Sequence, residues 1–230
     1  MDRGLPIRDV VSVRHLLEDG GADDRLCNDA VRMAASDDWV RFVLARPVVE
    51  PPGSRFVYNT GAVHLLAPIL QRATGLDPAD FAERHLFGPL GIEEVRWVRP
   101  SNASPPLPLL GGGLSLAARD MAKMGQLLAD EGRWMGRSVV QAAWIQGILD
   151  AARPATLQDG YGRLWWFRAG APTASGGWRP DTWFARGSGG HHLFVLPALE
   201  LVVAFQPQEP AEGLRAFEYL ARVVDALDAG

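Results

Sequence analysis

The sequence predicts an α+β fold in which a helical lobe is followed by antiparallel strands and a closing helix. Up to about residue 150, apolar residues recur at helical spacing between capping residues. From Tyr161 onward, short apolar runs alternate with turns that contain Gly or Pro, which is typical of antiparallel strands. We therefore expect one domain over 1–230, mostly helical over 1–155, with the strands and closing helix over 156–230.

Capping residues mark the helices of the first part. Ser36 can cap the first helix, and Asp77, which precedes a proline, can start the third. Ser115 can cap the fourth helix, and Gly75 and Gly132 stand where the second and fourth would end. The residues expected on one face of each helix are, in order, Trp39, Phe42 and Val43; Leu65, Leu66, Ile69 and Leu70; Phe81, His85 and Leu86; and Met121, Met124, Leu127 and Leu128.

Four strands, one further helix and the closing helix complete the expected elements. The further helix covers roughly 138–149, and 100–108 is a proline-rich surface loop. The strands are expected at 164–167, 182–185, 193–196 and 201–205. The apolar stripe of the closing helix is Leu214, Phe217, Leu220, Val224 and Leu227.

Composition restricts the classes of partner. The net charge of −4 gives no basic field that would attract nucleic acid or anionic lipid. A single cysteine, Cys27, cannot form an intrachain disulfide or a cysteine-based metal cluster. The chain has no signal-peptide core and no apolar run long enough to span a membrane. As the sequence stands, we expect a cytoplasmic protein with no membrane or nucleic-acid partner.

The segment 52–75, PGSRFVYNTGAVHLLAPILQRATG, carries the most informative pattern in the chain. A turn and a short extended Phe56-Val57-Tyr58 precede an amphipathic helix. The order Pro-Gly-x-x-Phe-x-Tyr, a small polar pair, then Gly and Leu-Leu resembles the tyrosine motif of serine hydrolases related to class C β-lactamases and penicillin-binding proteins. That resemblance implies that the hydroxyl of Tyr58 belongs to the proton-transfer machinery beside a serine nucleophile.

Six other segments resemble this family, and all seven follow its order over nearly the whole chain. They are VSVRHLL (11–17), DDWVRFVLAR (37–46), FGPLGI (87–92), GGGLSLAARDMAKMG (111–125), YGRLWWF (161–167) and GSGGHHLFVLPALELVVA (187–204). The resemblance implies a partial β-lactamase/transpeptidase-like fold. The family's first strands and nucleophile helix have no counterpart among these segments.

The family's nucleophile motif, Ser-x-x-Lys, does not occur in these 230 residues. The only lysine, Lys123, has Asp120 three residues before it. The family also commonly has Tyr-x-Asn, whereas here Thr60 stands at the asparagine position. Either Asn59 substitutes by a local rearrangement, or recognition of a substrate amide is altered.

A third family motif, Lys-Thr-Gly or His-x-Gly, matches Gly187-Ser188-Gly189-Gly190-His191 best. The resemblance places Ser188 at the cationic or histidine position, with Gly189 and Gly190 beside the substrate. A serine cannot supply a positive charge for a substrate carboxylate, so a neutral ester or amide fits better than a β-lactam or D-alanyl peptide. The alternative interpretation is an ordinary glycine-rich hairpin turn.

The remaining histidines and tryptophans give no cofactor or metal site. Adjacent strand residues such as His191 and His192 point to opposite faces, so we expect no metal there. We expect His15, His64 and His85 to be core or boundary residues. The tryptophans of the strand region either belong to the core or form the wall of a pocket; they are Trp165, Trp166, Trp178 and Trp183.

Two functions of different classes follow. In the first, the chain belongs to a β-lactamase-related hydrolase whose nucleophile segment lies upstream or on another polypeptide. In the second, it is a non-catalytic remnant that binds a small ligand or a protein partner through the former cleft. A Ser-x-x-Lys encoded upstream of Met1 would favour the first. In either case the resemblance leaves a sheet edge without its neighbour, so we expect self-association or a complementing N-terminal segment.

Overall fold

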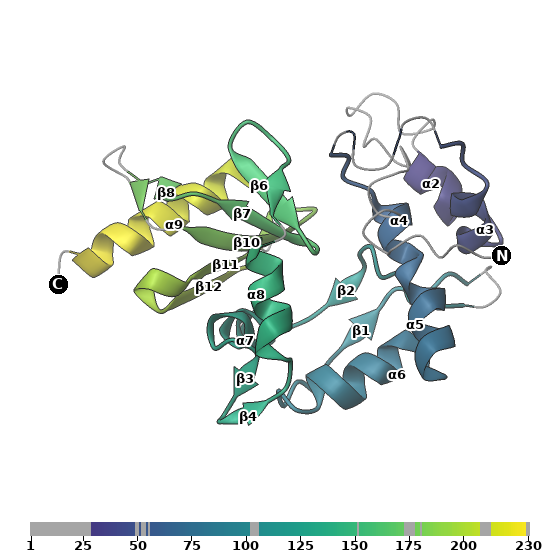
Figure 1. Cartoon of the computed structure of the whole chain (residues 1–230), viewed down its shortest axis with the longest axis horizontal. Helices are drawn as coiled ribbons and strands as arrows, with labels where there is room; N and C mark the ends of the chain where they lie inside the picture. The colour runs from purple at the N-terminus through teal and green to yellow at the C-terminus, as the bar shows by residue number, and fades with distance from the viewer. Residues whose placement is uncertain are drawn as a thin grey trace. The chain divides into compact units, whose positions relative to one another are not determined.

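The computed structural model describes residues 29–48, 51, 54, 56–101, 106–150, 152–172, 178–179, 181–207 and 213–228. The chain divides into two compact units, Met1–Ser115 and Leu116–Gly230, which are coloured purple to teal and teal to yellow in Figure 1. The segment 11–17, His15 and Cys27 lie outside the described residues. The predicted α+β class with an antiparallel sheet is confirmed.

Short helices and one two-stranded ribbon form the first unit. Its elements are α2 (Asp29–Ala34), α3 (Trp39–Leu44), α4 (Thr60–His64), α5 (Leu66–Thr74), α6 (Pro78–Ala82), the π-helical turn η1 (Glu83–Phe87), β1 (Arg96–Trp97) and β2 (Leu114–Ser115). One buried cluster joins α2, α3 and the start of α5; its members are Met33, Trp39, Val43 and Leu65. The predicted inner face of the first helix is therefore confirmed for Trp39 and Val43.

The caps of these helices follow the sequence with one exception. Asp77 caps α6 by accepting from Ala79 N at 2.8 Å, and Gly75 ends α5 in the left-handed region with φ 74°, as predicted. Asp38, and not Ser36, caps α3, because its carboxylate reaches Arg41 N at 2.8 Å. The prediction for Ser36 was wrong: its hydroxyl donates instead to the carbonyl of Met33.

A proline divides the helix that follows the tyrosine motif. α4 ends at His64 and α5 begins at Leu66, with Leu65 between them. Pro68 has no N–H to donate to the carbonyl of His64 four residues earlier, and its ring crowds that carbonyl. The two helices therefore meet at a break that the apolar spacing alone does not reveal.

A bidentate ion pair joins α6 to the strand region of the first unit. The guanidinium of Arg99 donates to the two carboxylate oxygens of Asp77 at 2.7 and 2.9 Å. Hydrogen bonding from Arg99 lowers the pKa of Asp77 below its usual value. The residue that starts α6 thus also anchors the segment after β1.

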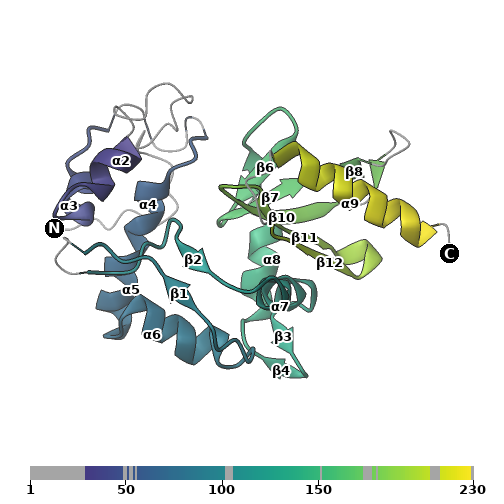
Figure 2. The same cartoon turned by 180° about the vertical axis from the view of Figure 1, so that it is seen from behind.

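The second unit contains a six-stranded antiparallel sheet in the order β12-β11-β10-β7-β6-β5. Its elements are α7 (Ala118–Ala129), β3 (Arg133–Trp134), β4 (Arg137–Ser138), α8 (Ala142–Asp150), β5 (Arg153–Pro154), β6 (Asp159–Gly162), β7 (Trp165–Arg168), β8 (Ala171–Pro172), β9 (Trp178–Arg179), β10 (Thr182–Gly187), β11 (His191–Leu196), the 3₁₀ turn η2 (Pro197–Leu199), β12 (Leu201–Phe205) and α9 (Gly213–Asp228). Helices cover this sheet on both faces (Figure 2).

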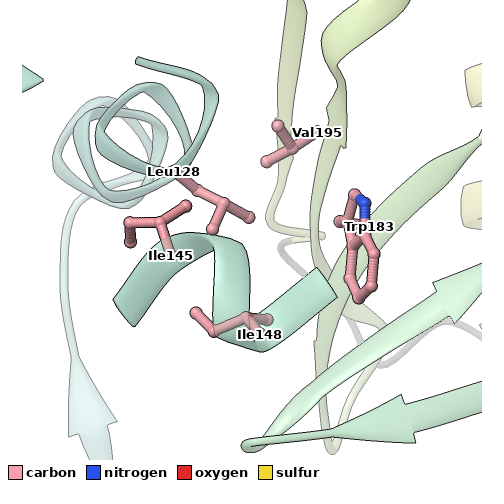
Figure 3. Close-up of a cluster of buried hydrophobic side chains, with 5 residues drawn as sticks. All are labelled: Leu128, Ile145, Ile148, Trp183 and Val195. Atoms are coloured by element: carbon pink, nitrogen blue, oxygen red, sulfur yellow. The ribbon is translucent and has the colours of Figure 1, made fainter. Parts of the chain in front are cut away.

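Alternation along the strands decides which helix covers which face. Trp183 and Val195 pack with residues of α7 and α8 in one buried cluster, completed by Leu128, Ile145 and Ile148 (Figure 3). The next residues along these strands, Phe184 and Phe194, contact Phe217 of α9 on the opposite face. None of the helices in the described part of the chain is both long and apolar enough to cross a bilayer.

The start of α7 and α8 differs from the predictions. Ser115 lies in β2, and α7 begins at Ala118 after Ala117, without a side-chain cap. The helix expected over 138–149 begins only at Ala142, because Ser138 pairs with Arg133 in a small ribbon. Since α7 and α8 pack on the sheet, the change from helices to strands near residue 155 falls within the second unit.

The predicted strands and closing helix are largely confirmed. The four expected strands correspond to β7, β10, β11 and β12. Leu164 is the exception: it lies in the turn before β7 with φ 72°. In α9, Leu220 and Val224 are buried as expected, but Leu227 is 56% exposed.

Candidate functional site

Tyr58 lies in the first unit, two residues before α4. It belongs to no strand, and its side chain is 42% exposed. An exposed phenol can both donate and accept a proton or a hydrogen bond. The partly exposed side chain of Tyr58 is compatible with the predicted proton-relay role, and the role itself stays a prediction.

Asn59 caps α4 immediately after Tyr58. Its backbone is extended, with φ −145° and ψ 98°, and its Oδ1 accepts from Ala62 N at 2.8 Å. The residue is only 4% exposed. The cap fixes the direction in which the chain leaves Tyr58, because an N-cap side chain satisfies a helix N–H that has no other partner. The substrate-binding role assigned to Asn59 stays a prediction, and the amide oxygen already has this internal partner.

Thr60, the first residue of α4, contacts the glycine-rich loop of the same unit. A Cβ atom on Gly111 would overlap the Thr60 carbonyl oxygen and lie 2.6 Å from its Cγ2 atom. Only glycine permits so close an approach. The structure thus brings together the tyrosine motif and the loop 111–113, which lie far apart in the sequence. This contact was not predicted, because the run Gly111-Gly112-Gly113 marks a loop but does not show which segment approaches it.

The predicted third motif lies in the hairpin between β10 and β11 of the second unit. Gly187 pairs with His191, so Ser188, Gly189 and Gly190 form the turn. Gly189 and Gly190 have φ values of 84° and 88°, which a residue with a side chain rarely adopts. The strand ends at Gly187, so Ser188 lies in the turn, which agrees with the alternative interpretation of a glycine-rich hairpin. Ser188 and Gly189 are exposed, Gly190 is buried, and the substrate-binding role of all three stays a prediction.

The buried side chain of His192 contacts this turn. It is 3% exposed, its Nδ1 lies 3.0 Å from the carbonyl oxygen of Gly190, and its ring stacks on Phe194 at 5.2 Å. Burial lowers the pKa of the His192 imidazole. His191 is exposed, so the two histidines point to opposite faces as predicted. Over the described ranges, no three His, Cys, Asp or Glu side chains gather closely enough to hold a metal ion.

The structure also shows the surroundings of the lysine and of the remaining histidine and tryptophan candidates. Lys123 Nζ lies 2.8 Å from Asp120 Oδ1 on α7. His64 is 2% exposed and packs edge-on against Trp39 at 5.4 Å, and burial lowers the pKa of His64. The core prediction is confirmed for His64 and wrong for His85, which is exposed. Of the tryptophans, Trp166 and Trp183 belong to the core.

Comparison with known protein families identifies the family to which this chain belongs. The sequence profile of the Beta-lactamase family matches residues 2–224. The chain belongs to this family. The predicted relationship of the chain to β-lactamase-related serine hydrolases is thereby confirmed.

The chain matches part of a longer curated relative. The chain is 27% identical over 121 residues to the 6-aminohexanoate-dimer hydrolase of Paenarthrobacter ureafaciens. That alignment takes in 48% of this chain and 30% of the relative. The chain therefore spans well under two thirds of this relative.

Two solved structures show the same fold. A Bacillus anthracis protein assigned as a 6-aminohexanoate-dimer hydrolase superposes with a TM-score of 0.69 at 22% identity, over 96% of this chain and 59% of that one. The penicillin-binding protein of Bacillus halodurans superposes with a TM-score of 0.66 at 17% identity, over 99% of this chain and 74% of that one. The predicted β-lactamase/transpeptidase-like fold is confirmed.

Proposed function

We propose that the chain is a β-lactamase-related domain for ester or amide ligands that performs no acyl-enzyme chemistry by itself. One observation carries this proposal: Ser-x-x-Lys occurs nowhere in the 230 residues. The only lysine lies 2.8 Å from the carboxylate of Asp120. Hydrolysis would require another polypeptide segment that carries the serine and its base.

The chemistry of acyl transfer explains why this absence matters. A serine hydroxyl becomes a nucleophile only when a nearby base takes its proton. A tyrosine hydroxyl can relay that proton, and two N–H groups can stabilise the oxyanion that forms. Tyr58 could supply the relay, but a relay and an oxyanion site without an attacking group break no bond.

The ligand class is proposed from the residues and from the relatives. Ser188 has no charge with which to hold a carboxylate, which favours a neutral ester or amide. The name of one relative, 6-aminohexanoate-dimer hydrolase, states that it hydrolyses a dimer of an amino acid. The two units of a linear amino-acid dimer are joined by an amide. The amide bond is compatible with both lines of argument, whereas the terminal carboxylate of a linear amino-acid dimer would find no positive charge at Ser188.

A second candidate function is binding without turnover. The packed helix cap at Asn59 and the turn held by His192 are formed without a nucleophile. A chain that keeps these elements can still recognise a small ligand or a protein segment. Saturable binding of an amide ligand that survives incubation intact would support this function and exclude catalysis on that ligand.

Replacing Tyr58 with phenylalanine is expected to leave the hydrolysis of activated p-nitrophenyl esters unchanged. No acyl-enzyme step exists in this chain for the phenol to serve, so any residual rate would come from general surface catalysis. The measurement is the initial rate for the native chain and for Tyr58→Phe. The matched control is Tyr219→Phe, since Tyr219 is 48% exposed and Tyr58 is 42% exposed.

A selective loss of rate would contradict the proposal. Removing acid–base help typically lowers a rate by about a hundredfold or more. If Tyr58→Phe lost that much while Tyr219→Phe did not, a nucleophile not recognised in the sequence would be working beside Tyr58.

A further inference from the structure

The buried side chain of His192 is a titratable group to which the proposed function gives no role. It lies on β11, two residues after Gly190, and only 3% of its surface is exposed. Its ring stacks on Phe194 with the centroids 5.2 Å apart, and it meets Phe217 of α9 edge-on at 5.9 Å. His192 therefore lies between the sheet and α9, next to the turn 188–190.

One hydrogen bond fixes both the turn and the tautomer of the His192 ring. The Nδ1 atom lies 3.0 Å from the carbonyl oxygen of Gly190. Because a carbonyl oxygen can only accept, Nδ1 carries the proton, and Nε2 of the neutral ring carries none. Gly189 and Gly190 both have positive φ values, and glycine has more backbone freedom to lose than any other residue. The bond to Gly190 thus restrains the part of the hairpin that has the most freedom to rearrange.

Burial and neighbouring cations oppose a second proton on the His192 ring. Arg186 of β10 pairs in register with His192, so the two side chains share one face of the sheet. The guanidinium of Arg186 lies 3.9 Å from the ring centroid of Trp166, which keeps its charge close to the sheet. Burial is the largest cause that lowers the pKa of His192; the bond to Gly190 opposes it, and the charges of Arg186 and His191 add to it.

The other elements packed against the ring present aromatic side chains. β12 pairs Phe205 with His192, and α9 places Phe217 against it. Arg168, whose guanidinium lies 4.0 Å from the ring centroid of Phe217, is paired with the carboxylate of Asp159. The stacked aromatic ring beside His192 would attract an imidazolium. Burial and the charge of Arg186 prevail over this attraction, since the pKa of His192 is lowered.

We propose that His192 is the positioning residue of the turn 188–190 and makes the order of this turn depend on pH. The neutral ring holds the Gly190 carbonyl, whereas a second proton drives the ring toward water, breaks the bond and releases the turn. The released form takes up this proton near the ordinary pKa of 6.5, and the closed form only at lower pH. The closed turn therefore has its full stability above about pH 6.5 and loses stability as the pH falls below that value. Weaker ligand binding by the released turn is a consequence that rests on the function proposed above.

Nitrogen and amide NMR of the full chain between about pH 4.5 and 8 tests the proposal. We expect the His192 ring to carry its proton on Nδ1 at the upper end of this range and to titrate with a midpoint below 6.5. The amide signals of Ser188 and Gly189 should change with the same midpoint. His191→Gln is the matched control, because His191 is an exposed histidine one residue away, and it should leave this titration unchanged. Since no ligand is present, the result does not depend on the proposed function.

Two substitutions at His192 separate the effect of pH from the effect of packing. His192→Asn keeps an N–H that can donate to Gly190 but takes up no proton, so the turn should stay ordered over the whole pH range. His192→Leu keeps an apolar side chain without the donor, so amide exchange in the turn should be about twofold to tenfold faster at neutral pH. Turn amides in the native chain that do not follow the His192 titration would overturn the proposal, and this result needs no variant. A His192→Asn chain that keeps the native pH dependence would overturn it as well.

Discussion

Asp159→Ala is expected to lower the free energy of unfolding by about 3–5 kcal/mol. The carboxylate of Asp159 accepts two hydrogen bonds from Arg168, from Nε at 2.6 Å and from Nη2 at 3.0 Å. The side chains are 7% and 13% exposed, and the guanidinium lies 4.0 Å from the ring centroid of Phe217. Removing the carboxylate leaves a buried cation without a partner, which is far less favourable than either the intact pair or an apolar replacement of both residues.

Urea denaturation followed by circular dichroism measures this effect. The double variant Asp159→Ala/Arg168→Met should be more stable than Asp159→Ala alone, since it removes the unpaired charge. Asp150→Ala is the control at an exposed carboxylate and should change the stability by less than about 0.5 kcal/mol. A double variant no more stable than the single one would show that the lost charge pair is not the cause.

Gly132→Ala is expected to lower the free energy of unfolding by about 2–5 kcal/mol. Gly132 follows α7 with φ 84°, a left-handed conformation that costs a residue with a Cβ atom about 1–2 kcal/mol. The residue is buried, and its carbonyl accepts from Val139 N and Val140 N at 2.9 and 3.0 Å. A Cβ atom here would overlap the carbonyl oxygen of Val140 and lie 2.9 Å from its carbon, so the turn cannot relax without losing these bonds.

The chain provides a matched control four residues later. Gly136 has φ 81°, but a Cβ atom there would have no neighbour within 4 Å. In Gly136→Ala, the unfavourable left-handed backbone conformation is therefore the only cost, and it should lower the free energy of unfolding by about 1–2 kcal/mol. Equal losses for the two variants in thermal unfolding would mean that the backbone contact with Val140 contributes nothing.

The predictions that succeeded rest on local physical chemistry. Asp77 before a proline and Gly75 after a helical pattern are cap signals that hold in the structure. The strand β12 follows from its apolar run, since the predicted 201–205 agrees with Leu201–Phe205. In the candidate site, the residue order around Tyr58 predicted that a helix follows it, although the structure divides this helix into α4 and α5.

The predictions that failed concern residues whose position is decided by neighbouring residues or paired strands. Ser115 pairs in β2 and is therefore unavailable as a helix cap. Ser36 and Asp38 both suit a cap, and the choice depends on where the first helical N–H groups lie. The sequence left open whether Ser188 lies in a family motif or in a plain hairpin turn, because the turn depends on the register of β10 and β11, which pairs Gly187 with His191. The contact between Thr60 and Gly111 is tertiary and has no local pattern.

Intact-mass spectrometry after treatment with a fluorophosphonate or a penicillin probe tests the central claim most directly. The claim is that the chain keeps the tyrosine motif of a β-lactamase-related fold but has no group that attacks an acyl bond. We predict that the 25.0 kDa chain remains unmodified after prolonged incubation with either probe. A stoichiometric adduct on any side chain of the native protein, lost on unfolding before treatment, would contradict the claim.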